Sequence, residues 1–440
     1  MAPQAEELRL RIERFFKMSG FRLAYLSYIG KWAFLGFIVG VVGGVAAIIF
    51  QAMLILLETF FWEKFALLTG EKLATLLLPA FGGLVSGVIV YKVAPEAEGH
   101  GTDAVIRAIH RRWSKIRARV PLVKVIASSA VIASGGSAGK EGPIAQVAAG
   151  AASILGEKLG LRVCDRRVFV AAGIAAGIGA IFKAPFGASL FAIEVLYKRD
   201  YEVEAFVPSI IASVVGYSIY CSVYGWTPVL SFPGNIFIPP IEFIFVAILG
   251  LLSGFLAVIY VKIFYGMRDY VFNRIKVSPC IRPMIGGLLV GLIGLYIPHV
   301  MGAKYNVLNM IINGAYTSTI FLFSLMIFKL LATCFTVSSG GSGGIFMPSL
   351  FIGASFGALM GILFHMLLPG TVKFPIVYAL IGMAALFAGA GKVPLTSIVM
   401  VTELTGGYSL LVPTTLASAI SYVVSGPMTI YEAQIIERER

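Results

Sequence analysis

A stretch of twenty residues occurs twice in this chain, and the repeat limits the possible folds more than any other feature. Lys124 to Pro143 reads KVIASSAVIASGGSAGKEGP, and Lys329 to Pro348, 205 residues later, reads KLLATCFTVSSGGSGGIFMP. At an offset of 209, a second set of residues also aligns: Gly173, Lys183, Pro185 and Glu194 with Gly382, Lys392, Pro394 and Glu403. The chain therefore contains two homologous halves, over about residues 60–220 and 280–425, and the similarity alone leaves parallel and inverted arrangements open.

The composition places both halves in a membrane. Hydrophobic residues make up 58% of the 440 residues and charged residues only 13%, against roughly 25% charged residues in soluble domains. Apolar segments lie near residues 32–57, 73–94, 122–138, 168–197, 205–241, 243–261, 284–299, 318–338, 344–368, 374–402 and 407–425. We therefore predict an all-α integral membrane protein with a single transmembrane domain over residues 32–440.

Some of these segments do not fit a simple membrane span. Residues 205–241 carry no charge but contain several prolines and glycines, so we expect a pair of helices there. The glycine-rich loops 135–142 and 340–344 end two segments inside the apolar region. Non-helical backbone at membrane depth persists only where protein or a water-filled cavity satisfies its polar groups, so these loops predict broken helices.

Charge predicts the orientation. Residues 1–31 are rich in Arg and Lys and precede a charge-free run, 32–57, that is longer than the apolar core of a signal peptide. We expect residues 1–31 to form a cytoplasmic amphipathic helix. The formal net charge of +13 comes largely from short segments between spans, as in 107–124 and 158–167, which indicates positive-inside topology with cytoplasmic termini rather than nucleic-acid binding. The predicted location is the plasma membrane, or the inner membrane of a cell that has two.

The repeated loops predict an anion site. Each loop runs into a proline, Pro143 or Pro348, that is typical of a helix start. Two helix N-termini in low dielectric offer unpaired N–H groups and partial positive charge, which favour an anion and still allow its release. Folds built on inverted repeats place their sites where such broken helices meet at mid-membrane.

Glu141 is the acid of most interest in these loops. It lies at the predicted anion site, whereas the equivalent position of the second half is Phe346. An ionised carboxylate there can imitate the anion and a protonated one can leave, so we predict that Glu141 is a gate. The alternative is a helix-start carboxylate that only satisfies local N–H groups.

These motifs resemble those of the CLC family of chloride channels and chloride/proton exchangers, over nearly the whole chain. Gly139-Lys140-Glu141-Gly142-Pro143 resembles the family's G(R/K)EGP motif, and Gly344-Ile345-Phe346-Met347-Pro348 resembles GxFxP. Tyr431 matches the tyrosine that closes the inner side of the central anion site. The resemblance implies an inverted-repeat membrane domain, a homodimer with one chloride pathway per subunit, and no cytoplasmic CBS domains. It also implies one gating residue, Glu141, and these anion-binding residues: His100, Lys140, Gly142, Gly344, Ile345, Phe346 and Tyr431.

Two departures from the family pattern affect the expected mechanism. His100 stands where the family has a serine hydroxyl, and a neutral imidazole can donate one hydrogen bond while a protonated one adds charge. Val195 replaces the inner proton-transfer glutamate, and we expect the adjacent Glu194 and its repeat partner Glu403 to have structural or helix-end roles. Passive chloride flux is therefore favoured. The alternative is a chloride/proton antiporter with another proton route, through water, His100 or the acids Glu202 and Glu204.

An enzyme is the competing class of function. Residues 135–139 and 340–344 both match G-x-S-x-G, which would make Ser137 or Ser342 a nucleophile in an intramembrane hydrolase. The preceding strand that this motif needs is not predicted, so we expect no enzyme activity. We also expect no cofactor and no metal site, because the four cysteines are scattered without a CxxC pair. The expected partners are chloride or a similar small anion, the lipid bilayer and a second copy of the chain.

Overall fold

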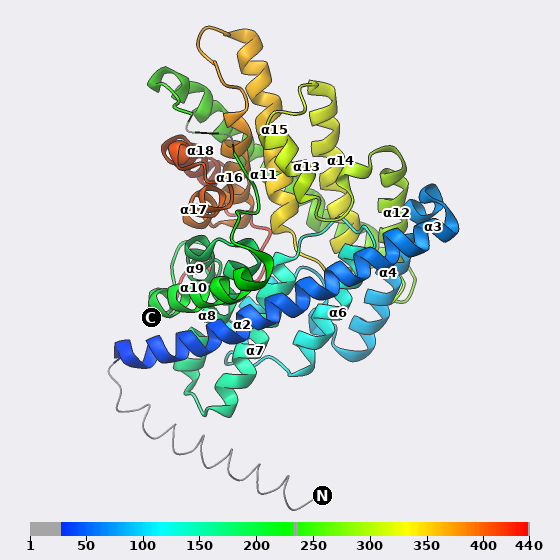
Figure 1. The fold of residues 1–440 in the computed structure, drawn as a ribbon, viewed down its shortest axis with the longest axis vertical. Coiled ribbons are helices and arrows are strands. Elements are labelled where there is room, and N and C mark those ends of the chain that lie inside the picture. The colour runs from blue at the N-terminus through cyan, green and yellow to red at the C-terminus, as the bar shows by residue number, and fades with distance from the viewer. Residues whose placement is uncertain (1–27, 233, 235, 439–440) are drawn as a thin grey trace, which may run out of the picture.

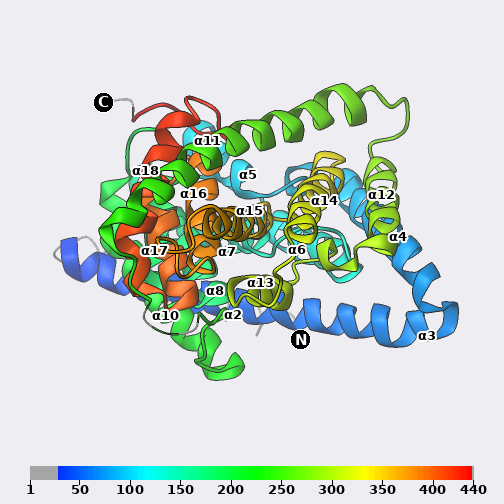
Figure 2. The same cartoon turned by 90° about the horizontal axis from the view of Figure 1, so that it is seen from above.

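The computed structural model describes residues 28–232, 234 and 236–438, and these residues form helices without a β-strand. The expected amphipathic helix at 1–31 falls almost entirely outside the described residues. The helices pack at many angles around a central region, and α2 runs across one face of the molecule (Figures 1 and 2). They are α2 (Tyr28–Thr59), α3 (Ala66–Thr69), α4 (Glu71–Val93), α5 (Thr102–Arg111), α6 (Arg119–Ala133), α7 (Glu141–Lys158), α8 (Val163–Phe182), α9 (Pro185–Glu194), α10 (Phe206–Tyr224), α11 (Phe243–Gly266), α12 (Arg282–Tyr296), α13 (Tyr305–Ile312), α14 (Thr319–Ser338), α15 (Phe346–Leu367), α16 (Val377–Gly391), α17 (Pro394–Thr405) and α18 (Leu411–Val424).

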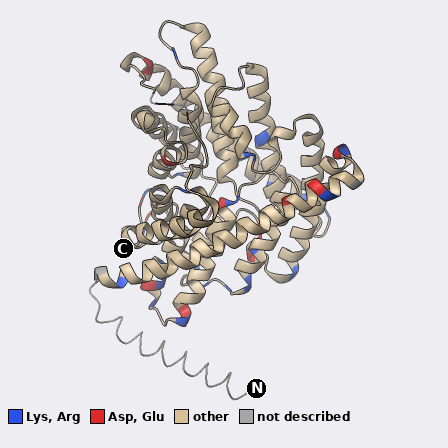
Figure 3. Cartoon of the chain, viewed as in Figure 1, with Lys and Arg blue, Asp and Glu red and all other residues tan. Residues whose placement is uncertain are grey.

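The helices confirm an integral membrane protein. Within the described residues, six helical stretches are long and apolar enough to cross a membrane: Gly30–Phe65, Glu71–Val93, Val203–Tyr224, Pro240–Arg274, Thr319–Ser338 and Phe346–Leu367. Helix α2 exposes Phe34, Phe37, Ile49 and Leu56, which suits a lipid-facing surface. Charged residues are sparse along the long helices (Figure 3).

The two halves are related by a local two-fold axis. Gly139 and Gly344, which are equivalent in the repeat, exchange both backbone hydrogen bonds at 2.7 Å. Ser128 Oγ lies 2.8 Å from Ser342 Oγ, and the equivalent pair, Ser137 Oγ and Thr333 Oγ1, is 3.1 Å apart. From this crossing α7 and α15 extend in opposite directions (Figure 1). The halves are thus inverted, which decides the question that the sequence left open.

Two of the apolar segments, 168–197 and 374–402, each contain two helices rather than one. Lys183 separates α8 from α9 and Lys392 separates α16 from α17, both in the left-handed conformation with φ of +56° and +57°. A proline follows two residues later in each case, and the residue before a proline disfavours the helical conformation. Apolar composition alone did not reveal these breaks.

The predicted helix pair over 205–241 is wrong, because α10 is the only α-helix among the described residues of that segment. Pro208 lies in the first turn of α10, where its missing N–H costs nothing. Gly216 lies inside the helix because a Cβ there would be 2.7 Å from the carbonyl oxygen of Ala176 on α8. Gly225, with φ of +77°, ends the helix.

Each half of the chain has an acid that caps a helix N-terminus in the other half. Glu194, at the end of α9, accepts hydrogen bonds from the backbone N–H groups of Leu395 and Thr396 at 3.1 and 2.7 Å, at the start of α17. Glu403 of α17 accepts equivalent bonds from Phe186 and Gly187 at 3.1 and 2.6 Å, at the start of α9. Carboxylates at helix N-termini are stabilising, and the contacts confirm the expected helix-end roles.

Two buried lysines fix the loops that lead to the central region. The Nζ atom of Lys124 donates to the carbonyl oxygens of Ala97 and Gly99 at 2.9 and 2.7 Å. Its repeat partner, Lys329, donates to Val300 and Gly302 at 3.0 and 2.7 Å. Neither side chain is exposed to solvent. The carbonyl groups replace water around each cation and hold both loops in place.

Candidate anion site

The N-termini of α7 and α15 meet at the centre of the molecule, and the carboxylate of Glu141 lies between them. A side chain at Gly139 would overlap this carboxylate, and a Cβ at Gly344 would be 3.0 Å from its Oε2 atom. The carboxylate also interacts with the backbone N–H group of Met347. The helices begin at Glu141 and Phe346, two residues before the prolines. Glu141 thus places its carboxyl group where two helix N-termini converge, a position that favours negative charge.

A cavity of about 10 Å³ continues from Glu141 toward Tyr431, with room for roughly one small molecule the size of water. Five of the predicted residues meet here, because Glu141, Gly142, Ile345, Phe346 and Tyr431 all line it. Gly344 directly precedes Ile345. The rest of the lining is Thr102, Ile178, Phe182, Phe191 and Met400. We call this space the narrow cavity.

The narrow cavity has a wide cavity on each side, so the constriction lies between two larger spaces. One, of about 720 Å³, is the arginine cavity, which is lined by Arg107, Arg112, Arg117, Arg268 and Arg282 together with His100, acids and other residues. The other, of about 620 Å³, is the Lys140 cavity, whose lining includes Gln51, Glu58, Lys140, Lys304 and Tyr305. Such a series of spaces is suited to the passage of a small ion.

Two predicted site residues lie beside the narrow cavity rather than on it. The imidazole of His100 is buried, with Nε2 3.3 Å from Oδ2 of Asp103 and its ring 5.5 Å from the ring of Tyr431. Among the described residues, Nδ1 of His100 has no hydrogen-bond partner. The Nζ atom of Lys140 donates to Oε1 of Gln51 at 2.9 Å. His100 therefore lies toward the arginine cavity and Lys140 toward the other wide cavity.

Sequence reasoning missed two residues at this site. The hydroxyl of Tyr305 donates to Oε1 of Glu141 at 2.7 Å, and Thr102 lines the narrow cavity. The lysine contacts extend the repeat at an offset of 203, because Gly99 and Gly302 are equivalent acceptors. At this offset Thr102 and Tyr305 are themselves equivalent, so a longer alignment of the halves would have paired them without indicating that Tyr305 reaches Glu141.

Tyr431 belongs to a C-terminal segment that is held at several points. The hydroxyl of Tyr265 donates to the carbonyl oxygen of Ile430 at 2.7 Å, and the N–H of Ala433 donates to Oδ1 of Asp103 at 3.2 Å. Further along, the N–H of Arg438 donates to Oδ2 of Asp200 at 3.0 Å. These contacts fix the position of the Tyr431 side chain, whose ring is 6.1 Å from that of Phe191.

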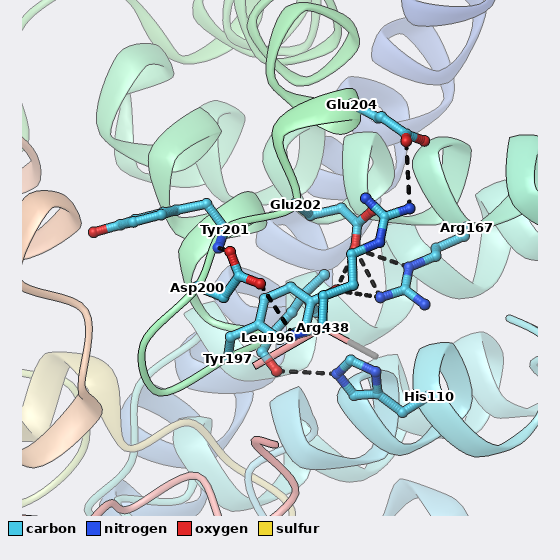
Figure 4. Close-up of polar contacts among 9 residues, drawn as sticks. All are labelled: His110, Arg167, Leu196, Tyr197, Asp200, Tyr201, Glu202, Glu204 and Arg438. Atoms are coloured by element: carbon cyan, nitrogen blue, oxygen red, sulfur yellow. Dashed lines mark hydrogen bonds and ion pairs between the residues drawn. The ribbon is translucent and has the colours of Figure 1, made fainter. Parts of the chain in front are cut away.

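A polar cluster around the buried Glu202 anchors the end of this segment (Figure 4). Glu202 is fully buried, and it pairs with Arg167 at 2.7 Å and with Arg438 at 3.4 Å. It also accepts a hydrogen bond of 2.6 Å from the hydroxyl of Tyr197. Glu204 pairs with Arg438 at 3.3 Å. Both acids that the sequence suggested as alternative proton carriers are thus engaged with cations.

The serine-hydrolase alternative has no support in the geometry. The hydroxyl of Ser137 contacts Thr333, and that of Ser342 contacts Ser128 and donates to the carbonyl oxygen of Ala97 at 3.0 Å. His299 packs against Tyr316 and Phe321, and His365 contacts the carbonyl oxygen of Val372. Neither serine therefore contacts the bases that this alternative requires.

Comparisons with known proteins agree with the geometry. Residues 82–426 match the model of the voltage gated chloride channel family. An uncharacterised protein of Methanocaldococcus jannaschii is 33% identical over 93% of this chain and 96% of its own length. A putative chloride channel protein, ClcB-like, of Ralstonia nicotianae is 32% identical over 83% and 86%. The crystal structure of a CLC-type fluoride/proton antiporter superimposes with a TM-score of 0.81 at 23% identity, over 94% of this chain and all of that one.

Proposed function

This chain belongs to the voltage-gated chloride channel (CLC) family of anion transporters, and we propose that it conducts chloride passively under the control of Glu141. One observation carries the proposal: a carboxylate lies where two inverted helix N-termini meet, between two wide cavities. The same partial positive charge that holds this carboxylate suits a small anion. While Glu141 is ionised and in place, it closes the pathway.

We assign roles to the residues around the gate. Gly142, Ile345 and Phe346 line the narrow cavity, and their backbone N–H groups would hold the anion. Gly344 would shape the site instead, because its N–H already donates to the carbonyl oxygen of Gly139. Tyr431 closes this cavity on the side of the arginine cavity. Lys140 and His100 lie one on each side of it, where positive charge would raise the local anion concentration.

The environment of the acids favours passive flux over proton exchange. Val195, at the position of the family's inner proton-transfer glutamate, is fully buried and cannot bind a proton. The nearby acids already form other contacts, since Glu194 caps α17 and Glu202 is paired with two arginines. A continuous proton route requires connected polar groups, and these contacts do not provide one.

A chloride/proton antiporter is the second candidate. His100 is hydrogen-bonded to Asp103 and contacts the ring of Tyr431, so it could carry a proton between the arginine cavity and the gate. The similar fold of a named fluoride/proton antiporter shows only that the architecture permits exchange. His100 is therefore the group to change if exchange is observed.

Flux from liposomes tests the proposal. Purified protein is reconstituted into chloride-loaded liposomes, and chloride release and external pH are recorded together with two electrodes. We expect chloride release without stoichiometric proton movement. We also expect Glu141→Gln to conduct at every pH, because the amide cannot act as a titratable imitation of the anion. Flux of Glu141→Gln that still depends on pH as in the wild type would exclude Glu141 as the gate.

We further propose a homodimer in the plasma membrane or an inner membrane, with cytoplasmic termini and a single membrane domain over residues 32–440. The arginines of the arginine cavity support this orientation, because positive charge concentrates on the cytoplasmic side. Cys164 is exposed and lies within the basic segment 158–167. Its accessibility to a membrane-impermeant thiol reagent therefore tests the orientation. Labelling in intact cells would contradict it.

A further inference from the structure

Tyr305 contacts the proposed gate directly, from the side of the Lys140 cavity. It is the first residue of α13, and its hydroxyl donates to Oε1 of Glu141 at 2.7 Å. The Nζ atom of Lys140 lies 4.9 Å from the centre of its ring. Tyr305 also lines the Lys140 cavity, whereas Glu141 lines the narrow cavity. The phenol therefore lies at the boundary between these two spaces.

The chain holds Tyr305 in this position by several means. Lys329 fixes the preceding loop through two carbonyl oxygens, and the N–H of Gly302 donates to the carbonyl oxygen of Gly135 at 2.9 Å. Lys304, immediately before Tyr305, has a left-handed backbone with φ of +46°, which is unfavourable for a residue with a side chain. The surrounding contacts thus maintain a strained backbone that leads directly into the residue touching the gate.

We propose that Tyr305 is the positioning residue that keeps Glu141 in its closed place, and this inference rests on the proposed role of Glu141 as the gate. A phenol donates more strongly to an ionised carboxylate than to a protonated one. Tyr305 therefore stabilises the ionised, blocking form. When Glu141 takes up a proton this preference is lost, and the side chain is free to leave the narrow cavity.

Other charged or titratable groups also act on Glu141. Three further groups interact electrostatically with the carboxylate of Glu141. They are Lys140, which directly precedes it, Lys329 on α14 and Tyr431 in the C-terminal segment. Lys304 adds positive charge near Lys329. A Tyr305→Phe variant retains all of these groups and the ring beneath Lys140. A change in gating would therefore report the loss of the phenol alone.

The test compares chloride flux of Tyr305→Phe with that of a matched control. Tyr378→Phe is the control, because it also removes a buried phenol that donates to a carboxylate, Glu242 at 3.2 Å, but lies outside the three cavities. We expect Tyr305→Phe to raise flux at neutral pH by roughly tenfold, as for the loss of one hydrogen bond to a charged group. Its half-maximal flux moves to higher pH, because the ionised form loses its donor. Tyr378→Phe should leave both quantities unchanged.

A second background separates gating from folding. In Glu141→Gln the blocking carboxylate is absent, so adding Tyr305→Phe should change flux no further. Unchanged or lower flux in a monodisperse Tyr305→Phe protein would overturn the inference while leaving the gate itself intact. Glu141→Gln that retains the wild-type pH dependence would instead overturn the proposed function. If Tyr305→Phe does not elute as a single species, Tyr305→Leu, which also lacks the phenol, takes its place in the same comparison.

Discussion

His100 changes the hydrogen bonding at a position of the anion site where the CLC family has a serine. Its Nε2 atom points to Asp103, which also accepts a hydrogen bond from the backbone N–H of Ala433. Asp103 thus links the imidazole to the segment that carries Tyr431. A serine hydroxyl at this position would be too short to reproduce both the contact with Asp103 and the ring contact with Tyr431. The substitution therefore exchanges a small neutral donor for a group that can carry charge.

We predict that His100→Ser changes anion selectivity. The variant removes the imidazole next to Tyr431 and leaves Asp103 with the N–H of Ala433 but without the imidazole, so its negative charge faces the arginine cavity less shielded. Chloride flux should fall, and the order among chloride, bromide, nitrate and fluoride should change, as measured by flux with each anion in turn. Asp103→Asn is the matched variant, since it keeps the shape and removes the charge. An identical selectivity series in wild type and His100→Ser would place the imidazole outside the pathway.

The sequence identified individual site residues, but it did not identify the side chains that contact them. Glu141 was found because an acid at a helix start in the apolar region has a chemical reason, Tyr431 because of the resemblance to the CLC family, and both line the narrow cavity. Tyr305 was missed because its role depends on a loop fixed by Lys329, and no local pattern marks a tyrosine that reaches an acid 164 residues away. Contacts that depend on such long-range placement require the structure.

At the scale of elements, the reciprocal caps connect the two halves most directly. Glu194 and Glu403 each satisfy backbone N–H groups at the start of a helix in the other half, so each helix end depends on its repeat partner. The aligned glutamates were visible in the sequence. The helix breaks before these N-termini were not, because Lys183 and Lys392 interrupt segments whose apolar character is otherwise continuous.

We predict that Glu194→Gln destabilises the protein more than Glu403→Gln. Glu194 is buried and also accepts a hydrogen bond from the hydroxyl of Thr396, whereas Glu403 is half-buried and accepts two backbone bonds. Loss of one of the two acceptor oxygens at Glu194 should lower the free energy of unfolding by about 2 kcal/mol. Thermal unfolding in detergent measures both variants, with the exposed Glu437→Gln as control. Equal midpoints for Glu194→Gln and Glu437→Gln would contradict the capping role.

The C-terminal segment should loosen when its anchor is removed. Arg438 pairs with Glu202 and Glu204 at the end of the segment that positions Tyr431 (Figure 4). We predict that Arg438→Gln speeds hydrogen exchange in peptides covering residues 431–438, because two ion pairs are lost together. Arg438→Lys, which keeps the charge, should exchange more slowly than Arg438→Gln. Wild-type protection in Arg438→Gln would show that the hydrogen bonds of Ile435 and Ile436 hold the segment unaided.

For the whole molecule, the inverted halves explain why the pathway is narrow only at its centre. The two-fold crossing at Gly139 and Gly344 brings both loops together, so small residues are required there and the helices diverge on either side. Divergence leaves a wide cavity on each side of the crossing. The repeat predicted this meeting of helices, whereas the size and lining of the cavities depend on packing across the halves.

Coupling to protons is the property of the whole molecule that the departures from the family pattern decide. A proton moving from the arginine cavity to Glu141 needs acceptors along the way, and Val195 is apolar while Glu202 is held by Arg167 and Arg438. We therefore predict that a chloride gradient imposed on liposomes drives no uphill proton movement. Val195→Glu is the complementary variant, because it places an acid at the missing position. Proton pumping by the wild type that disappears in both Glu141→Gln and His100→Ser would instead establish exchange through the imidazole, and would leave the gate assignment in place.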